Sequence, residues 1–115
     1  MQVKYSKRVQ KTGFERVQAR KKGVKEYINA TRSSWLGNPF PLSKYSLEIS
    51  LKMYRKYLFW RLRIDVQFRK YLVQLKRDAR IYTVRIGCTC DLSKRCHVDE
   101  LIHFIKNDVI FADGK

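Results

Sequence analysis

Residues 81–105, IYTVRIGCTCDLSKRCHVDELIHFI, are expected to form a strand, a loop and a helix in direct succession. Ile81–Ile86 is rich in β-branched residues and runs into Gly87, which predicts a strand that ends where the cysteines begin. A helix from about His97 is predicted by an apolar face with helical spacing, made of Val98, Leu101, Ile102 and Ile105. This succession of elements favours an α/β fold.

Two further helices are predicted before this strand. Ser46 suits a helix N-cap, and the helix after it has an apolar face of Leu47, Leu51, Tyr54 and Leu58. Asp65 could cap a second helix, whose apolar face comprises Phe68, Tyr71, Leu72 and Leu75. The intervening FWRLRI, residues 59–64, either continues the first helix or forms a kink.

The N-terminal part of the chain predicts strands and an ordered loop. FERVQAR from Phe14 and VKEYINAT over Val24–Thr31 favour strands, with a turn at Lys22-Gly23. SSWLGNPFP, residues 33–41, is expected to be a loop, and VIF at 109–111 either adds a short strand or packs. We therefore expect one small Rossmann-like α/β domain over residues 14–115, its sheet and helices in two or three layers, after a basic arm or edge strand at 1–13.

The charge of the chain predicts a polyanionic partner. Among 115 residues, 26 Lys and Arg face 10 Asp and Glu, which gives a formal net charge of +16. The excess lies before residue 88, because residues 88–115 hold four basic and five acidic side chains. Ordinary solubility requires a net charge of only about 2–8 in magnitude. Nucleic acid is the partner class that such a balance most often indicates.

The cysteine count and the hydropathy of the chain predict a compartment. There are three cysteines, an odd number, and MQVKYSKRVQ at the start has charge but no apolar run. No apolar stretch approaches the ~18–20 residues of a membrane span. We expect a cytoplasmic protein with reduced thiols and no membrane partner.

Two motifs together resemble a known family. YINATRSSWLGNPF contains Arg32 and the Gly37–Phe40 loop, and VRIGCTCDLSKRCHVDELI contains a Cys-x-Cys strand exit and a Cys-His pair. In this order they resemble the domain of unknown function 4326, which is found widely in bacteriophage and bacterial genomes. The resemblance covers roughly residues 15–105, with Thr31 and Asp91 where the family often has Gly and Pro. It implies a Rossmann-like fold and a phage origin, with the cytoplasm of a host cell as the compartment, and it implies no established activity.

The loop GCTCDLSKRCH, residues 87–97, has several chemical interpretations. Zinc could be held by Cys88, Cys90, Cys96 and His97, since thiolates and imidazole make tetrahedral sites. Against this, Cys88 and Cys90 on one extended strand would point to opposite faces, and adjacent Cys96 and His97 seldom reach the same ion. Metal is therefore not favoured. A structural disulfide is disfavoured by the reducing compartment.

Catalysis and anion binding are the other functional interpretations of this loop. Cys96 lies at a helix start beside Lys94, Arg95 and His97, a setting in which it or Cys90 could act as nucleophile with His97 as acid or base. A phosphate could instead bind the helix N-terminus and its two cations, with Arg32 and Asn38 approaching from the other loop. Alternatively, the cysteines only fill space and His97 caps the helix. Of the functional interpretations, we favour phosphate binding.

The predicted helices also present cations beside aromatic residues, as nucleic-acid surfaces often do. The expected surface comprises Lys52, Arg55, Lys56, Arg69, Lys70, Lys76 and Arg77. No recognised nucleic-acid-binding motif is present, so binding would be directed at the backbone. We expect a small basic protein that binds nucleic acid or a nucleotide-like phosphate ligand. The alternatives are an enzyme acting on a nucleotide or nucleoside derivative through Cys96 and His97, and a phage inhibitor of a host nucleic-acid-processing complex.

Overall fold

The computed structural model describes residues 12–19, 26–31, 34–90 and 92–109. Within them the chain forms three strands and three helices in the order that the sequence predicts. Their bounds are β1 Gly13–Gln18, β2 Ile28–Asn29, α1 Leu47–Ile64, α2 Val66–Asp78, β3 Thr83–Cys88 and α3 His97–Asn107. Residues 1–11 of the predicted basic arm and the Lys22-Gly23 turn lie outside the described residues, and Gly13, the last residue of that arm, already belongs to β1.

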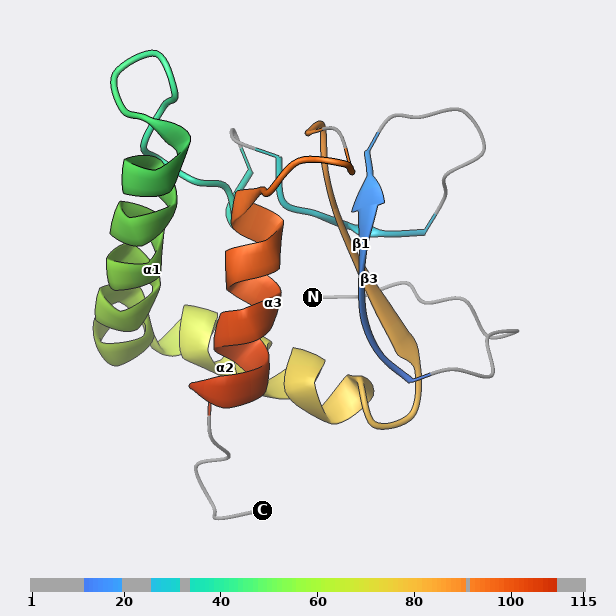
Figure 1. The fold of residues 1–115 in the computed structure, drawn as a ribbon. Coiled ribbons are helices and arrows are strands. Elements are labelled where there is room, and N and C mark those ends of the chain that lie inside the picture. Colours follow the sequence, from blue (N-terminus) through green and yellow to red (C-terminus); the bar gives the residue numbers. More distant parts are fainter. Residues whose placement is uncertain (1–11, 20–25, 32–33, 91, 110–115) are drawn as a thin grey trace.

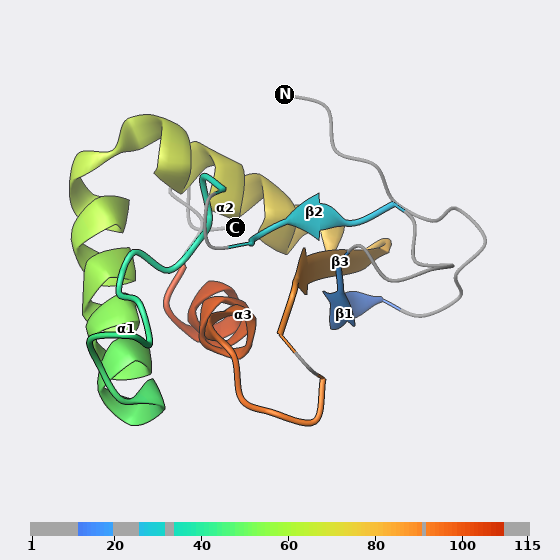
Figure 2. The same ribbon diagram turned by 90° about the horizontal axis from the view of Figure 1, so that it is seen from above.

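The sheet is parallel, with strand order β1-β3-β2. Along β1 the register runs from Gly13 opposite Thr83 to Gln18 opposite Cys88, and on the other side Ile28 lies opposite Ile86. All three helices lie on one side of this sheet, with α3 next to the strands and α1 farther from them (Figures 1 and 2). The described residues thus form a two-layer α/β arrangement, which confirms the predicted fold class.

The core lies between the sheet and the helices. Alternate residues of β3, namely Val84, Ile86 and Cys88, have at most 1% of their surface exposed and belong to the apolar cluster of the protein. The helices contribute the largest fully buried side chains to the same cluster, among them Tyr54, Phe68, Leu72, Leu101 and Phe104. Every second residue of β3 and one face of each helix, with a spacing of about 3.6 residues per turn, therefore pack together in one continuous core.

Two predicted strand boundaries were wrong. β3 begins at Thr83 rather than Ile81, because the backbone N–H groups of Ile81 and Tyr82 both donate to the Asp78 carbonyl and continue the turn that ends α2. The strand expected over 24–31 is described only as Ile28–Asn29. There the Asn29 side chain accepts a hydrogen bond from the Thr31 backbone N–H at 2.9 Å, which turns the chain.

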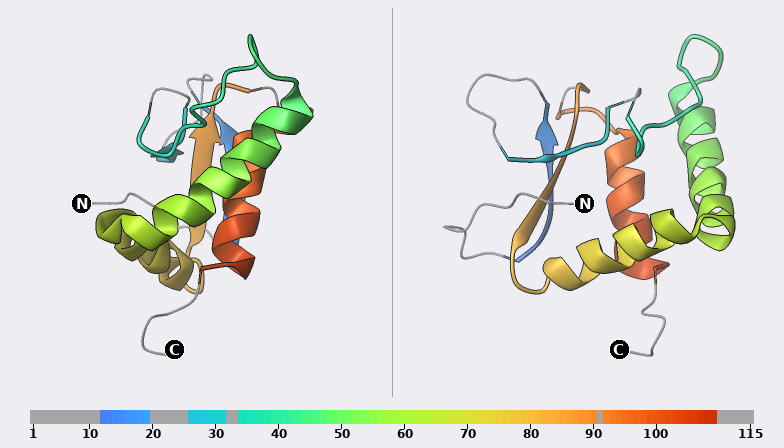
Figure 3. Two further views of the ribbon diagram at one scale, coloured as in Figure 1. Left: turned by 90° about the vertical axis from the view of Figure 1, so that its left-hand side faces the viewer. Right: turned by 180° about the vertical axis from the view of Figure 1, so that it is seen from behind.

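Residues 59–64 continue α1, which is one of the two predicted alternatives, and a kink between α1 and α2 follows them at Asp65. Asp65 has extended backbone angles and is both the last cap of α1 and the first cap of α2. Its carboxylate accepts hydrogen bonds from the Phe68 backbone N–H at 3.0 Å and from Arg61 Nε at 3.3 Å. The guanidinium of Arg69 donates to the Leu62 carbonyl at 3.0 Å, which satisfies the end of α1. The two helices therefore diverge sharply at one residue (Figure 3).

The face of the sheet opposite the helices is closely packed at Gly87. A Cβ added to Gly87 would lie 3.0 Å from Tyr27 Cδ2 and 3.1 Å from Val17 Cγ2. Both neighbours belong to the segments that flank β3, and Val17 lies directly opposite Gly87 in the register. Glycine at this position lets the Tyr27 ring lie directly against the central strand.

We expect Asp65→Asn to reduce stability only where the carboxylate is ionised. The backbone N–H of Phe68, followed by Arg61, holds the pKa of Asp65 below its usual value of 3.8. A lowered folded pKa stabilises the protein above the unfolded pKa, and this contribution is lost as pH falls toward the folded pKa. Asparagine keeps a capping oxygen without the charge. Melting temperatures of the two proteins should differ at neutral pH and converge in acid; a constant difference would contradict this role.

We expect Gly87→Ala to destabilise the protein by about 1–3 kcal/mol, because the added methyl group overpacks the contact with Tyr27 and Val17. Urea unfolding of a double-mutant cycle tests the cause. In a Tyr27→Ala background the same substitution should cost much less, since the ring that it meets is gone. Equal penalties in both backgrounds would show that crowding by Tyr27 is not the reason.

Candidate functional site

Three cysteines and one histidine meet at the carboxyl end of β3. The ligand atoms of Cys88, Cys90, Cys96 and His97 all lie within 4.8 Å of one another, and these residues could hold a metal ion. Sγ of Cys88 lies 2.7 Å from Sγ of Cys96, and the Cys96 sulfur lies 3.5 Å from Nδ1 of His97. Cys88, Cys96 and His97 are buried, and Cys90 is partly exposed. All three cysteines are free thiols.

The geometric argument against a shared site at these four residues was wrong. β3 ends at Cys88 and the chain bends at once, so Cys90 does not continue the strand and its sulfur turns back toward Cys88. Cys96 has extended backbone angles (φ −145°, ψ 160°), whereas His97 is the first residue of α3. This change of conformation between neighbours aims both side chains at one point. The two arguments against a shared site therefore fail. Cys88 and Cys90 do not alternate along one strand, and the adjacent residues Cys96 and His97 can reach the same point.

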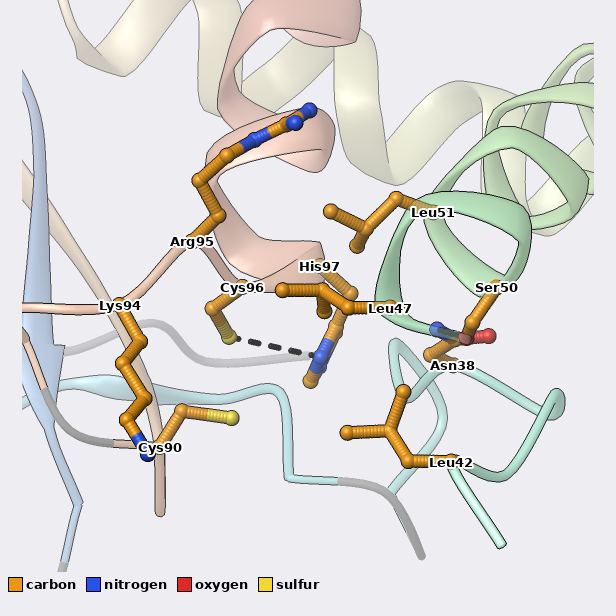
Figure 4. Close-up of a pocket in the computed structure, with 10 residues that line it drawn as sticks. All are labelled: Asn38, Leu42, Leu47, Ser50, Leu51, Cys90, Lys94, Arg95, Cys96 and His97. Atoms are coloured by element: carbon orange, nitrogen blue, oxygen red, sulfur yellow. Dashed lines mark hydrogen bonds between the residues drawn. The ribbon is translucent and has the colours of Figure 1, made fainter. Parts of the chain in front are cut away.

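The imidazole of His97 is held in one orientation. Its Nε2 lies 2.5 Å from the carbonyl oxygen of Ala30, just after β2. A carbonyl can only accept, so Nε2 carries a proton, and Nδ1 faces the Cys96 sulfur (Figure 4). The Tyr54 ring packs edge-on against the imidazole, with ring centroids 5.4 Å apart. His97 thus links β2, α1 and α3, and it does not cap the helix.

Cys96 is the N-cap of α3. Its sulfur accepts a hydrogen bond from the Val98 backbone N–H at 3.5 Å, and Asp99 Oδ2 accepts one from the Cys96 backbone N–H at 3.0 Å. The Arg16 guanidinium from β1 donates to the same Asp99 oxygen at 2.6 Å and to the Lys94 carbonyl at 2.7 Å. Protein groups therefore already occupy part of the helix start at which a phosphate was predicted. Arg16 was not predicted, since nothing in its local sequence places it beside residues 94–99.

The two closest thiols differ in acidity. The pKa of Cys88 is lowered to about 6, first because the Cys96 thiol donates a hydrogen bond to its sulfur, with help from the Cys90 backbone N–H and the Arg16 charge. The same hydrogen bond, together with burial, raises the pKa of Cys96. Burial also raises the pKa of Cys90. The thiolate therefore forms at Cys88, which does not favour Cys96 or Cys90 as the nucleophile of an enzyme.

A cavity of about 250 Å³ adjoins the cluster. Cys90, Cys96 and His97 form one wall and three leucines form another, and Asn38, Ser50, Lys94 and Arg95 also line the cavity (Figure 4). Five of the six predicted ligand-binding residues therefore line one cavity, namely Asn38, Lys94, Arg95, Cys96 and His97. Arg32 lies outside the described residues. Ala30 contacts His97, so the loop that begins after β2 lies beside the start of α3.

Asn38 has a structural part in this site. Its Oδ1 accepts from the Phe40 backbone N–H and its Nδ2 donates to Ser50 Oγ, both at 2.9 Å. Ser50 Oγ in turn donates to the Phe40 carbonyl at 2.6 Å. These buried bonds attach the Gly37–Phe40 loop to the first turn of α1. Asn38 is 2% exposed, so it shapes the cavity wall more than it offers free hydrogen-bonding groups.

The predicted basic surface divides into two kinds of residue. Arg69 donates to backbone carbonyls at the end of α1, and Lys76 Nζ donates to the carbonyls of Lys106 in the last turn of α3 and of Val109 just after it. Arg55 pairs with buried Glu100 at 2.6 Å, and Arg95 pairs with the same carboxylate at 3.2 Å. Arg55, Arg69 and Lys76 of the predicted surface therefore have structural partners, as does Arg95 of the predicted ligand site. The side chains of Lys52, Lys56, Lys70 and Arg77 are exposed, and so is that of Arg55.

One face of α1 carries exposed aromatic and basic side chains together. Lys52, Lys56, Trp60 and Arg63 follow one another at spacings of four, four and three residues, so they form one stripe along the helix, here called the α1 stripe. Trp60 is 56% exposed. Beside it lies a hollow of about 300 Å³ lined by Phe40, Met53, Lys56, Tyr57 and Trp60. Trp60 was not singled out from the sequence, although its spacing of four residues from Lys56 could have identified it.

Comparisons with known proteins add a family and no further match. In the described part of the chain, no helix has both the length and the apolarity of a membrane span. No curated protein matches the chain, and no solved structure does. Residues 15–107 match a family described as "Domain of unknown function (DUF4326)", which spans both the Gly37–Phe40 loop and the cluster of cysteines with His97. The chain therefore belongs to this family, as its two motifs predicted.

Proposed function

We propose that the protein binds single-stranded nucleic acid along the α1 stripe. The observation that carries the proposal is the hollow beside Trp60, whose lining combines the rings of Phe40, Tyr57 and Trp60 with Lys56. An exposed indole next to a lysine offers a base a stacking partner and its phosphate a positive charge. Lys52 and Arg63 extend the positive charge by about one turn on either side of Lys56 and Trp60.

The aromatic rings that line the hollow pack against one another. Tyr57 packs tilted against Trp60, with centroids 6.2 Å apart, and edge-on against Phe40, also at 6.2 Å. The neighbouring Phe59 packs edge-on against buried Phe104 at 4.9 Å. Preordered rings lose little conformational entropy when a base stacks on them. A duplex keeps its bases paired and stacked, so this arrangement favours single strands.

The net charge of the chain supports the same proposal. A net charge of +16 attracts a polyanion over a long range and raises the association rate at low salt. The α1 stripe would then orient the bound strand locally. Because no base-edge recognition motif is present in the sequence, the binding we propose has little sequence preference.

We expect fluorescence anisotropy to show tighter binding to a labelled oligothymidine strand than to a duplex of equal length. Trp60→Ala should weaken single-strand binding about 5- to 150-fold, because one stacked base contributes about 1–3 kcal/mol. The double variant Lys56→Gln/Arg63→Gln should reduce the slope of log K against log salt by about 1.4, which is about 0.7 for each phosphate contact.

A matched control separates this surface from general charge. Lys70→Gln/Lys106→Gln also removes two exposed cations, but from α2 and α3, and it should leave most of the affinity intact. Equal losses in the two double variants would contradict a defined binding face. Absence of binding at low salt would overturn the proposal and would favour a host protein as the partner of this basic surface.

A second candidate function is suggested by the cavity beside the cysteine cluster. Leu42, Leu47 and Leu51 give it an apolar wall, and Lys94 and Arg95 are exposed cations on its lining. Within the described residues no acidic group forms a salt bridge with Lys94, whereas Arg95 pairs with Glu100. The volume of the cavity, about 250 Å³, is just below the ~300–1,000 Å³ of pockets for drug-sized ligands. A cavity of this size suits a mononucleotide or a smaller phosphate ester.

We expect adenosine 5′-monophosphate to raise the melting temperature of the protein if this cavity is a ligand site, since a ligand of the folded state stabilises it by mass action. Lys94→Gln should abolish the shift, and Lys70→Gln should preserve it. Inorganic phosphate alone should give a smaller shift, because it leaves the leucine wall without contact. No shift with either compound would exclude the cavity as a site for these ligands.

A further inference from the structure

We propose that Cys88, Cys90, Cys96 and His97 form a structural zinc site. The chain has three cysteines and two histidines, and this one location gathers every cysteine and one histidine. Three thiolates and one imidazole are among the ligand sets that close a tetrahedral structural zinc site. Soft sulfur donors with imidazole select zinc over magnesium and calcium, which take oxygen ligands. This site is independent of the nucleic-acid surface proposed on α1.

The distances fit tetrahedral coordination. With zinc–sulfur bonds of about 2.3 Å and zinc–nitrogen bonds of about 2.0–2.1 Å, neighbouring ligand atoms lie about 3.5–3.8 Å apart. The four donor atoms lie within 4.8 Å of one another, and Cys96 Sγ and His97 Nδ1 are 3.5 Å apart. The two closest sulfurs, at 2.7 Å, would separate to about 3.8 Å around an ion. Small side-chain rotations therefore bring all four donors to bonding distance.

The surroundings of the donors also resemble those of a metal centre. A histidine that ligates a metal usually donates its other ring N–H to a carbonyl or carboxylate, and His97 Nε2 donates to Ala30. The Cys96 sulfur accepts a backbone N–H from Val98, and the Cys88 sulfur accepts one from Cys90. Such N–H groups stabilise the negative charge of thiolate ligands. Each of these three ligands is thus positioned by a backbone partner.

The charge balance favours a bound ion as well. Three thiolates with Zn²⁺ carry a net charge of −1, and the Arg16 guanidinium lies beside the start of α3, where it donates to Asp99 Oδ2 at 2.6 Å and to the Lys94 carbonyl at 2.7 Å. Lys94 and Arg95 line the adjoining cavity. A divalent ion would offset most of the negative charge of the three thiolates at this largely buried site. All four positions are filled by the protein, which makes the site structural and leaves no open position for a substrate.

The position of the site gives it a mechanical role. Cys88 ends the central strand, Cys90 follows the bend, and Cys96 and His97 begin α3. An ion at this point would connect both ends of the loop that joins the sheet to α3. Because a metal that binds only the folded state stabilises it, zinc should raise the melting temperature of the protein.

Metal analysis of the purified, reduced full chain tests the proposal. We expect about one zinc ion per chain, and substitution with Co²⁺ should give the intense visible bands of tetrahedral cobalt together with a thiolate charge-transfer band in the near ultraviolet. Cys90→Ala should lose the zinc and the thiolate-rich spectrum. Cys90 is the one partly exposed ligand, so its removal disturbs the core least. Circular dichroism of the variant checks that it is folded.

Two histidine variants complete the test. His97→Ala should lose the metal, whereas His97→Cys should retain zinc with a cobalt spectrum typical of four sulfurs. His103→Ala is the matched control, because His103 is exposed on α3 and lies outside the cluster, and it should bind zinc like the unchanged protein. Reduced, folded protein that takes up neither Zn²⁺ nor Co²⁺ would overturn the proposal. Equal zinc content in the unchanged protein, Cys90→Ala and His97→Ala would also overturn it.

Discussion

The pairing of β3 with parallel strands on both sides is the constraint on which the rest of the structure depends. Parallel strands direct their carboxyl ends to the same edge of a sheet, so Gln18, Asn29 and Cys88 end β1, β2 and β3 near one another. The loops that follow β2 and β3 start at this edge, and α3 begins beside it. The hydrogen bond from His97 to Ala30 joins these two regions directly. The cluster of cysteine and histidine side chains therefore lies at the edge where open α/β sheets generally bind their ligands.

The protein separates its buried chemistry from its charged exterior. Sulfur and imidazole groups lie between the sheet edge and α3, with the small cavity beside them. Exposed cations and Trp60 lie on the outer face of α1. Some basic side chains do not belong to this charged exterior but are buried and stabilise the fold. Arg61 is the clearest case, since it is 7% exposed, lies 4.1 Å from the Phe68 ring centroid and donates to the Trp35 carbonyl.

Periodicity in the sequence was enough to predict the element order and most of the core. The apolar faces of the three helices are local patterns, and Ser46 and Asp65 cap helices as local chemistry predicts. The cluster was harder to predict, because it depends on a bend after Cys88 and on the change of backbone angles at Cys96. Arg16 and Ala30 join the site only through strand register. Leu47 was predicted on a buried face but is 38% exposed, since it lies at the first turn of α1, where it lines the cavity.

The two fixed ends of α1 limit how sequences with this fold can diverge. Ser50 attaches the start of the helix to the Gly37–Phe40 loop, and Asp65 caps its end at the first turn of α2. Inserting or deleting one residue within the 18 residues of α1 would rotate the side chains of all later α1 residues by about 100° around the helix axis. An insertion before Tyr54, for example, would move Tyr54 and Leu58 out of the core and would turn Trp60 to the buried position that Arg61 now occupies. Changes of partner in related proteins should therefore arise by replacement of side chains on α1, while changes of chain length are confined to the loops.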